Sequence, residues 1–204
     1  MQKTQLMAKG SNESEVHKAP AFAVGTIVEF SEKSREHVGR ITAVEYKSNG
    51  GARYSVTDDL GKVFHIADKS VAFGLSAPNT PGAAERLFND FSEAHLISEM
   101  ELRGKLEVTP DLLEMAWEEC SEDSIDLTPK NFIELLHAHA ASAIETYMAW
   151  RLLKADISHV FFKDLKHNGR IVAFKAKARK GVDAAKQAFC SNPDHSDESD
   201  FCFV

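Results

Sequence analysis

The sequence has few cysteines, no long apolar run and no recognisable leader. Its three cysteines, Cys120, Cys190 and Cys202, are too few and too scattered for a disulfide framework, and an odd number is typical of a reducing compartment. No apolar stretch approaches the roughly 18 residues that a membrane helix needs. Residues 1–20 also lack the apolar centre of a secretory signal. We therefore expect an intracellular protein that does not span a membrane.

Both ends of the 204-residue chain are polar. We predict a disordered arm over residues 1–20 and an acidic disordered tail over residues 191–204, because neither segment has the apolar periodicity of a folded element. A transit peptide is the alternative for the arm, which would place the protein in a plastid rather than in the cytoplasm. Transit peptides are poor in acids, however, and the arm contains Glu13 and Glu15.

Residues 21–75 alternate between apolar and polar side chains with the period of a β-strand. We expect five short strands, at residues 25–30, 38–46, 53–57, 62–66 and 71–73. Asn49, Gly50 and Gly51 supply the positive-φ residues that a tight hairpin needs. Five short strands in so few residues favour a small SH3-like or OB-like barrel, since closure removes exposed strand edges.

A proline-containing linker at residues 76–82 separates this module from a helical one at residues 83–190. Helical periodicity predicts helices at 83–101, 111–120, 129–138 and 141–155. Two strands, 160–163 and 171–174, then flank a turn at 167–170, and a last helix is expected at 183–189. Helices followed by a β-hairpin are typical of a winged helix, a form of helix-turn-helix. The predicted fold class is therefore α+β, a barrel followed by a winged-helix domain.

The net charge of −7 conceals one basic segment. Residues 163–186 carry eight basic and two acidic side chains, a net charge of +6. Such a cluster binds nucleic acid by neutralising phosphates and releasing counterions, although lysines also keep an exposed hairpin soluble. The candidate RNA-binding residues of this segment are Lys163, Lys166, Arg170, Lys175, Lys177, Arg179 and Lys180.

The barrel offers a second candidate surface. Arg40, Arg53 and Lys62 accompany Tyr54 on the predicted strands, and exposed aromatic rings beside cations stack RNA bases. The alternative is that the ring fills the barrel core, since alternation alone does not say which face is wet.

No group of residues has the pattern of a catalytic or metal site. His137 and His139 are two positions apart, so a helix would point them in different directions. Cys190, His195 and Cys202 are irregularly spaced and are fewer than the four ligands of structural zinc. We predict no metal, no cofactor and no catalytic residue.

Several segments together resemble a known family. Residues 25–30, 113–119, 127–136 and 147–153, in this order and spacing, are similar to the N-terminal barrel and helix-turn-helix of plastid and cyanobacterial ribonuclease II-type exoribonucleases, the RNB family. The resemblance covers about residues 22–190. Members of this family degrade RNA from its 3′ end in a separate domain, where clustered aspartates hold magnesium, and that aspartate-rich motif has no counterpart here.

The resemblance implies an accessory region that steers single-stranded RNA and is itself non-catalytic. Two alternatives stay open. The first is that the winged helix is a protein-docking module. Its third helix, predicted at 141–155, carries little charge, since Glu145 faces only Arg151 and Lys154. Otherwise the chain is a truncated fragment of an active exoribonuclease.

Overall fold

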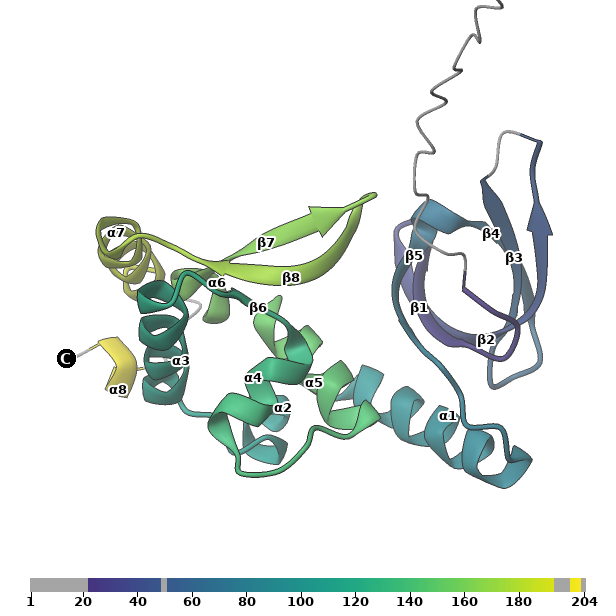
Figure 1. The fold of residues 1–204 in the computed structure, drawn as a ribbon, viewed down its shortest axis with the longest axis horizontal. Coiled ribbons are helices and arrows are strands. Elements are labelled where there is room, and N and C mark those ends of the chain that lie inside the picture. The colour runs from purple at the N-terminus through teal and green to yellow at the C-terminus, as the bar shows by residue number, and fades with distance from the viewer. Residues whose placement is uncertain (1–21, 49–50, 193–198, 203–204) are drawn as a thin grey trace, which may run out of the picture.

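The computed structural model describes residues 22–48, 51–192 and 199–202. The predicted arm, two residues of the predicted hairpin turn and most of the predicted tail lie outside the described residues. The first described module is an antiparallel five-stranded sheet in the order β4-β3-β2-β1-β5 (Figure 1). Its elements are β1 (Ile27–Glu32), β2 (Arg35–Tyr46), β3 (Ala52–Thr57), β4 (Val63–Ala67), the 3₁₀ turn η1 (Asp68–Ser70) and β5 (Val71–Leu75).

The sheet curls around its own apolar core because alternate residues of its strands are large and buried. Phe30 packs edge-on against Phe64, with ring centroids 5.2 Å apart, and Tyr54 lies in the same core. The strands cross closely at Gly39, where a Cβ atom would lie 2.5 Å from Cγ1 of Val56. A side chain at this position would therefore force the strands apart.

The second module is helical and contains a small sheet. Its order of helix, short strand, two helices and hairpin is that of a winged helix, with β6, β8 and β7 side by side in one antiparallel sheet. The elements are α1 (Pro81–Leu96), α2 (Glu99–Lys105), α3 (Pro110–Glu122), β6 (Asp126–Leu127), α4 (Pro129–Leu136), α5 (Ala143–Leu153), α6 (Ser158–Phe161), β7 (Phe162–His167), β8 (Arg170–Ala176), α7 (Arg179–Cys190) and α8 (Ser199–Cys202). The predicted α+β architecture, a barrel-like sheet followed by a winged helix, is confirmed.

Local capping sets the helix boundaries. Thr109 and Thr128 accept hydrogen bonds from the first turns of α3 and α4, and each is followed by proline at the first helical position. The single helix predicted at 83–101 is wrong, because Ser98 and Glu101 form a capping box that starts a new helix. The prediction of a strand from residue 160 is also wrong at its start, since Val160 and Phe161 belong to α6.

The predictions for the cysteines and for the end of the tail need correction. Cys190 and Cys202 form a disulfide, with Cα atoms 5.4 Å apart, and Cys120 is buried and free. The ring of Phe201 is buried, with its centroid 5.8 Å from that of Phe189. Residues 201–202 are therefore held against α7, where we expected a disordered segment and unpaired thiols.

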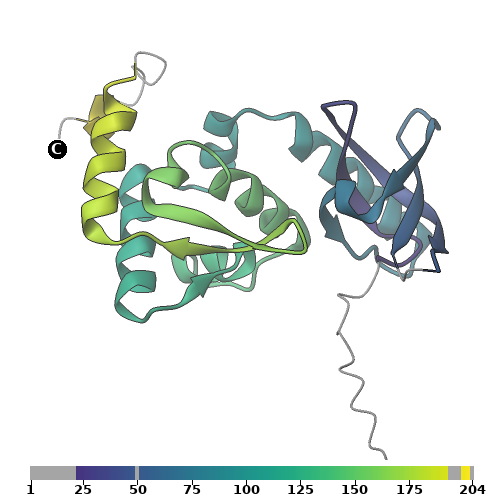
Figure 2. The ribbon, with the colours of Figure 1, turned by 90° about the horizontal axis from the view of Figure 1, so that it is seen from above.

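The two modules are packed against each other. Ile27 of β1 belongs to the core of the helical module, and Phe73 of β5 lies 4.9 Å from the ring of Trp150 and 5.3 Å from that of Tyr147. The tip of the β7–β8 hairpin also reaches the barrel, as both views show (Figures 1 and 2). The tip of the wing is thus braced against the barrel.

Candidate nucleic-acid interface

The cations of the predicted basic segment differ in what they contact. Arg170, at the tip of the wing, is only 14% exposed and pairs with Asp68 of the barrel. It also donates hydrogen bonds to the carbonyl oxygens of Asp68 and Val71, at 2.9 and 3.2 Å, and packs over the ring of Phe22. Its guanidinium group therefore fastens the wing to the barrel and is not free for phosphate.

Three further cations of this segment are held by neighbouring protein groups. Arg179 lies 3.0 Å from a carboxylate oxygen of Glu118 and stacks over Trp117. Lys177 donates to the carbonyl oxygen of His159, and burial lowers the pKa of its ammonium group. Lys166 pairs with Asp164 at 3.5 Å. A positive stretch of sequence is thus not a uniformly positive surface.

Lys163, Lys175 and Lys180 are exposed and have no ion pair with any described residue. Lys163 and Lys175 are direct cross-strand partners in the β7–β8 ladder, so both side chains lie on the same face of the sheet. Asp126 of β6 is the partner of Lys175 on its other side. This face therefore carries a row of three charged groups, two of them lysines.

The barrel residues predicted to bind RNA also differ in whether they are buried or accessible. Tyr54 is 1% exposed and donates a hydrogen bond to Asp68 at 2.5 Å. Burial and this bond raise the pKa of Tyr54 to about 12. The ring is a core group, so the interpretation that it stacks on bases is wrong.

The three predicted barrel cations differ in the same way. Arg40 contacts Glu85 at 3.0 Å and the carbonyl oxygen of Ala84 at 3.3 Å, which ties β2 to α1. Arg53 and Lys62 are exposed, and the ammonium group of Lys62 lies 4.4 Å from the centroid of the Phe64 ring. Only these two cations of the predicted barrel set remain accessible.

Helix α5, which occupies the position of the recognition helix in a winged helix, is covered by the protein itself. Of its eleven residues only Ala143 is exposed. Arg151 on this helix donates to the carbonyl oxygens of Ala94 and Ile97 at the end of α1. Little of α5 is therefore accessible for insertion into a major groove, which is how a winged helix usually contacts DNA.

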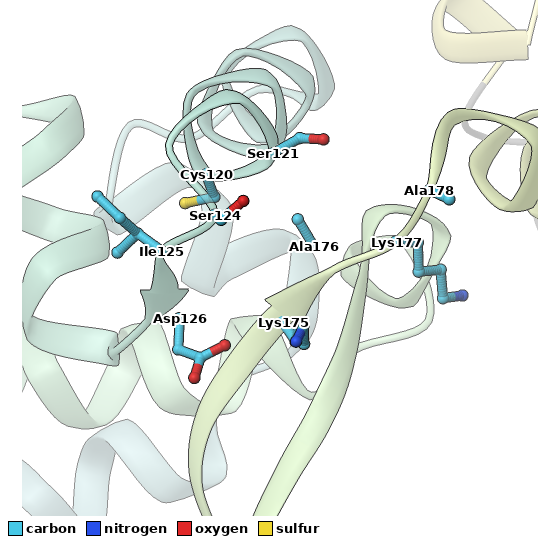
Figure 3. Close-up of a pocket in the computed structure, with 9 residues that line it drawn as sticks. All are labelled: Cys120, Ser121, Ser124, Ile125, Asp126, Lys175, Ala176, Lys177 and Ala178. Carbon is cyan, nitrogen blue, oxygen red and sulfur yellow. The ribbon is translucent and has the colours of Figure 1, made fainter.

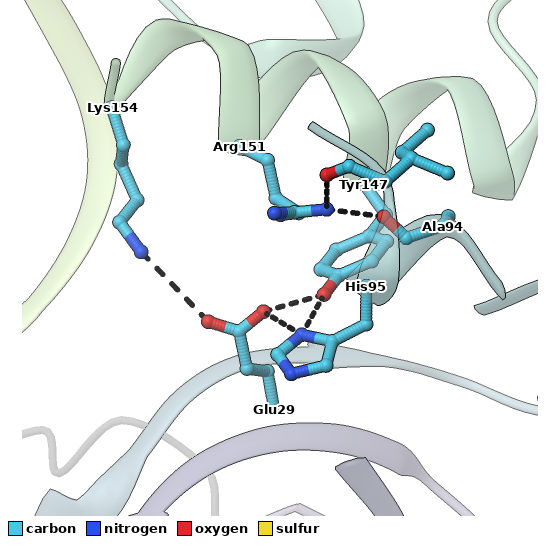
Figure 4. Close-up of polar contacts among 7 residues, drawn as sticks. Glu29, Ala94, His95, Tyr147, Arg151 and Lys154 are labelled. Carbon is cyan, nitrogen blue, oxygen red and sulfur yellow. Dashed lines mark hydrogen bonds and ion pairs between the residues drawn. The ribbon is translucent and has the colours of Figure 1, made fainter. Parts of the chain in front are cut away.

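A buried polar cluster joins α5 to the barrel (Figure 4). Glu29 of β1 is 1% exposed and accepts a hydrogen bond from the hydroxyl of Tyr147 at 2.5 Å. His95 lies 3.2 Å and Lys154 lies 3.8 Å from its carboxylate oxygens. Burial raises the pKa of Glu29, but these polar neighbours outweigh it and leave the pKa below its ordinary value. The cluster fixes the barrel against the covered helix.

A cavity of about 260 Å³ adjoins the lysine row, between the end of α3 and β8 (Figure 3). Lys175 lines it, so the row and the cavity are continuous. No sequence motif predicts this cavity, because its other lining residues come from the end of α3, the turn after it, and the end of β8 with the loop that follows. They are Cys120, Ser121, Ser124, Ile125, Asp126, Ala176, Lys177 and Ala178.

Within the described ranges, no group of three or more histidine, cysteine or acidic side chains is arranged to hold a metal ion. The same residues include no helix long and apolar enough to cross a membrane. Neither result bears on residues outside those ranges.

Comparison with known proteins adds one result to this geometry. No curated protein and no solved structure matches the chain. Residues 103–181, which include α3 to β8, match the family model described as the ribonuclease II winged helix domain. This match covers the three-stranded sheet, the lysine row and the covered helix, so this part of the chain is similar to a ribonuclease II winged helix domain.

Proposed function

We propose that the chain is an RNA-binding accessory module that steers single-stranded RNA and is itself non-catalytic. Two observations support this function: the match of residues 103–181 to the ribonuclease II winged helix domain, and the unpaired lysines on the open face of the wing. The second carries the most weight, because Lys163 and Lys175 lie directly opposite each other. Like charges in this arrangement destabilise a strand pair, and a polyanion on this face would relieve the repulsion.

The proposed RNA-binding face is the outer face of the β6-β8-β7 sheet. Lys180 follows β8 in the chain, at the start of α7. The opposite face packs Phe162 and Phe174 into the core. Because α5 is covered, recognition on this face would depend on phosphate contacts and on splayed bases, as is usual for single-stranded RNA.

The observation that suggested a protein-docking function has another explanation. The low charge of the third winged-helix helix suggested a protein-binding surface, but α5 is buried within the chain. Few charges are expected on a helix whose sides contact α1, α2, α4 and α6. Packing explains the low charge of α5, so RNA binding is the proposed function.

The test replaces both opposed lysines, in the variant Lys163→Gln/Lys175→Gln. Binding of a fluorescently labelled single-stranded oligoribonucleotide is measured by anisotropy over a series of salt concentrations. Losing two phosphate contacts should reduce the slope of log affinity against log salt by about 1.4, at roughly 0.7 per contact for single strands. Removal of the repulsion should leave the free energy of unfolding unchanged or raised by up to about 1 kcal/mol.

The matched control is Lys105→Gln/Lys130→Gln, which removes the same charge from exposed positions on α2 and α4. This control should keep most of the affinity and the slope. The proposal is wrong if wild-type protein shows no salt-dependent RNA binding, or if the wing variant and the control lose affinity equally.

A further inference from the structure

The cavity beside the lysine row exists because β6 is very short. Only Asp126 and Leu127 pair with β8, and before them the chain turns away from the sheet at Ser124, which has a φ of 55°. The amide of Ile125 donates to the carbonyl oxygen of Cys120 at 3.1 Å and closes the end of α3. The stretch of β8 and its following loop from Ala176 to Ala178 therefore has no neighbouring strand on this side, and the cavity occupies that place.

The lining of this cavity combines apolar surface with a few polar groups. Ile125, which is 50% exposed, and the methyl groups of Ala176 and Ala178 supply the apolar part. The hydroxyl groups of Ser121 and Ser124 lie toward α3, whereas Asp126 and Lys175 lie together at the opposite end (Figure 3). A flat heterocycle has apolar faces and polar edges, so it matches such a lining.

The size of the cavity limits its occupant. Its volume of about 260 Å³ is just below the roughly 300–1,000 Å³ of sites for drug-sized ligands. One ring system fits this space, whereas a larger cofactor does not.

The charged groups in and beside the cavity offer contacts both to a base and to its backbone. Helix α3 ends here, and the carboxyl end of a helix carries partial negative charge. Asp126 adds a carboxylate in the lining, and Asp123 is the exposed C-cap of the helix. The Asp126 carboxylate can accept a hydrogen bond from an amino group of a bound base. Lys175, which lines the same end of the cavity, and its cross-strand partner Lys163 provide positive charge for the flanking phosphates.

We propose that the cavity binds one nucleobase that carries an exocyclic amine, with Asp126 accepting a hydrogen bond from that amine. This inference rests on the proposed RNA binding and adds a base preference to it. Phosphates flanking the base lie on Lys175 and Lys163. Cytosine is the simplest such base, and uracil is its matched competitor because uracil has a carbonyl group where cytosine has the amine.

The experiment compares homopolymeric cytidine and uridine oligoribonucleotides of equal length at one salt concentration. A contact of carboxylate to amine should give wild-type protein about a tenfold preference for the cytidine oligomer. The variant Asp126→Ala removes the acceptor, so the ratio of the two affinities should fall close to one. Comparing variants cancels any intrinsic difference in stacking between the two oligomers.

Asp123→Ala is the matched control, because it removes an acidic side chain three residues away that does not line the cavity. Both variants should bind the uridine oligomer slightly more tightly than wild type, since each loses a negative charge, but only Asp126→Ala should lose the preference. Equal binding of the two oligomers by wild-type protein, or a preference that survives Asp126→Ala, overturns the cavity assignment and leaves RNA binding intact. If neither oligomer binds, the proposed function itself is wrong, and the cavity assignment fails with it.

Discussion

The contact of Tyr147 with Glu29 permits a quantitative test of how the covered helix is held. In Tyr147→Phe the hydroxyl donor is lost, but the ring keeps its place against Phe91, at a centroid distance of 3.8 Å. A hydrogen bond to a charged group contributes about 1.5–3 kcal/mol. His95 and Lys154 still neighbour the carboxylate, so we expect a loss of about 2 kcal/mol in the free energy of unfolding, within that range.

This loss corresponds to a fall in melting temperature of roughly 4–8 °C, at about 2–4 °C per kcal/mol for a chain of this size. It is measured by urea denaturation and by calorimetry at neutral pH. Tyr46→Phe is the matched control, because Tyr46 is 73% exposed and should tolerate the same change without effect. The reasoning is refuted if the two variants have the same stability.

The effect of Tyr147→Phe should also depend on pH in a defined direction. Burial raises the pKa of Glu29, but His95, Tyr147 and Lys154 bring it below the ordinary 4.5. A folded-state pKa below the unfolded one contributes stability above about pH 4.5, and this contribution is lost as the pH falls toward the folded-state pKa. The stability difference between wild type and Tyr147→Phe should therefore shrink below pH 4.5. A difference that grows on acidification would contradict this account.

Two other predictions concern side chains that the structure reassigns. Under denaturing, non-reducing conditions a thiol assay should detect Cys120 alone, and reduction of the Cys190–Cys202 disulfide should lower stability by at most about 3 kcal/mol, the value for a loop of similar length. Three reactive thiols before reduction would contradict the pairing. Lys177→Met should leave RNA affinity unchanged, because the ammonium group is already bound to the carbonyl oxygen of His159 and methionine keeps an apolar side chain of similar length where Lys177 lines the cavity. A loss as large as that of the wing variant would show that Lys177 contacts RNA.

Short-range signals in the sequence predict the elements well. The alternation of residues 25–73 corresponds to the five observed strands, because one face of each strand is buried in the barrel core. β1 also buries its other face, where Ile27 packs into the core of the helical module. Thr128 and Pro129 predict the start of α4, since an N-cap followed by proline depends only on local backbone chemistry. The resemblance to ribonuclease II-type proteins was also visible in residues 113–153, within the region of the family match.

Long-range pairing decides the site, and the sequence does not show it. Arg170, Arg179 and Lys175 are equally basic in sequence, but the two arginines pair with distant acids. Asp68 lies 102 residues before Arg170, and Glu118 lies 61 residues before Arg179. A charge count over a short window of sequence does not detect pairs that lie so far apart along the chain. The burial of Tyr54 is not predictable from its strand either, because alternation does not identify which face of a strand is buried.

The burial of α5 links these observations to the proposed function. A winged helix normally exposes its third helix, whereas here α1 and the barrel cover it, so the proposed RNA contact lies on another surface. Fastening the wing tip to the barrel with Arg170 holds the outer face of the wing sheet in a fixed orientation. A fixed face with two opposed lysines suits the flexible backbone of single-stranded RNA, because a rigid surface loses little entropy of its own on binding. The same contacts that cover α5 therefore agree with the proposed binding of RNA by the wing.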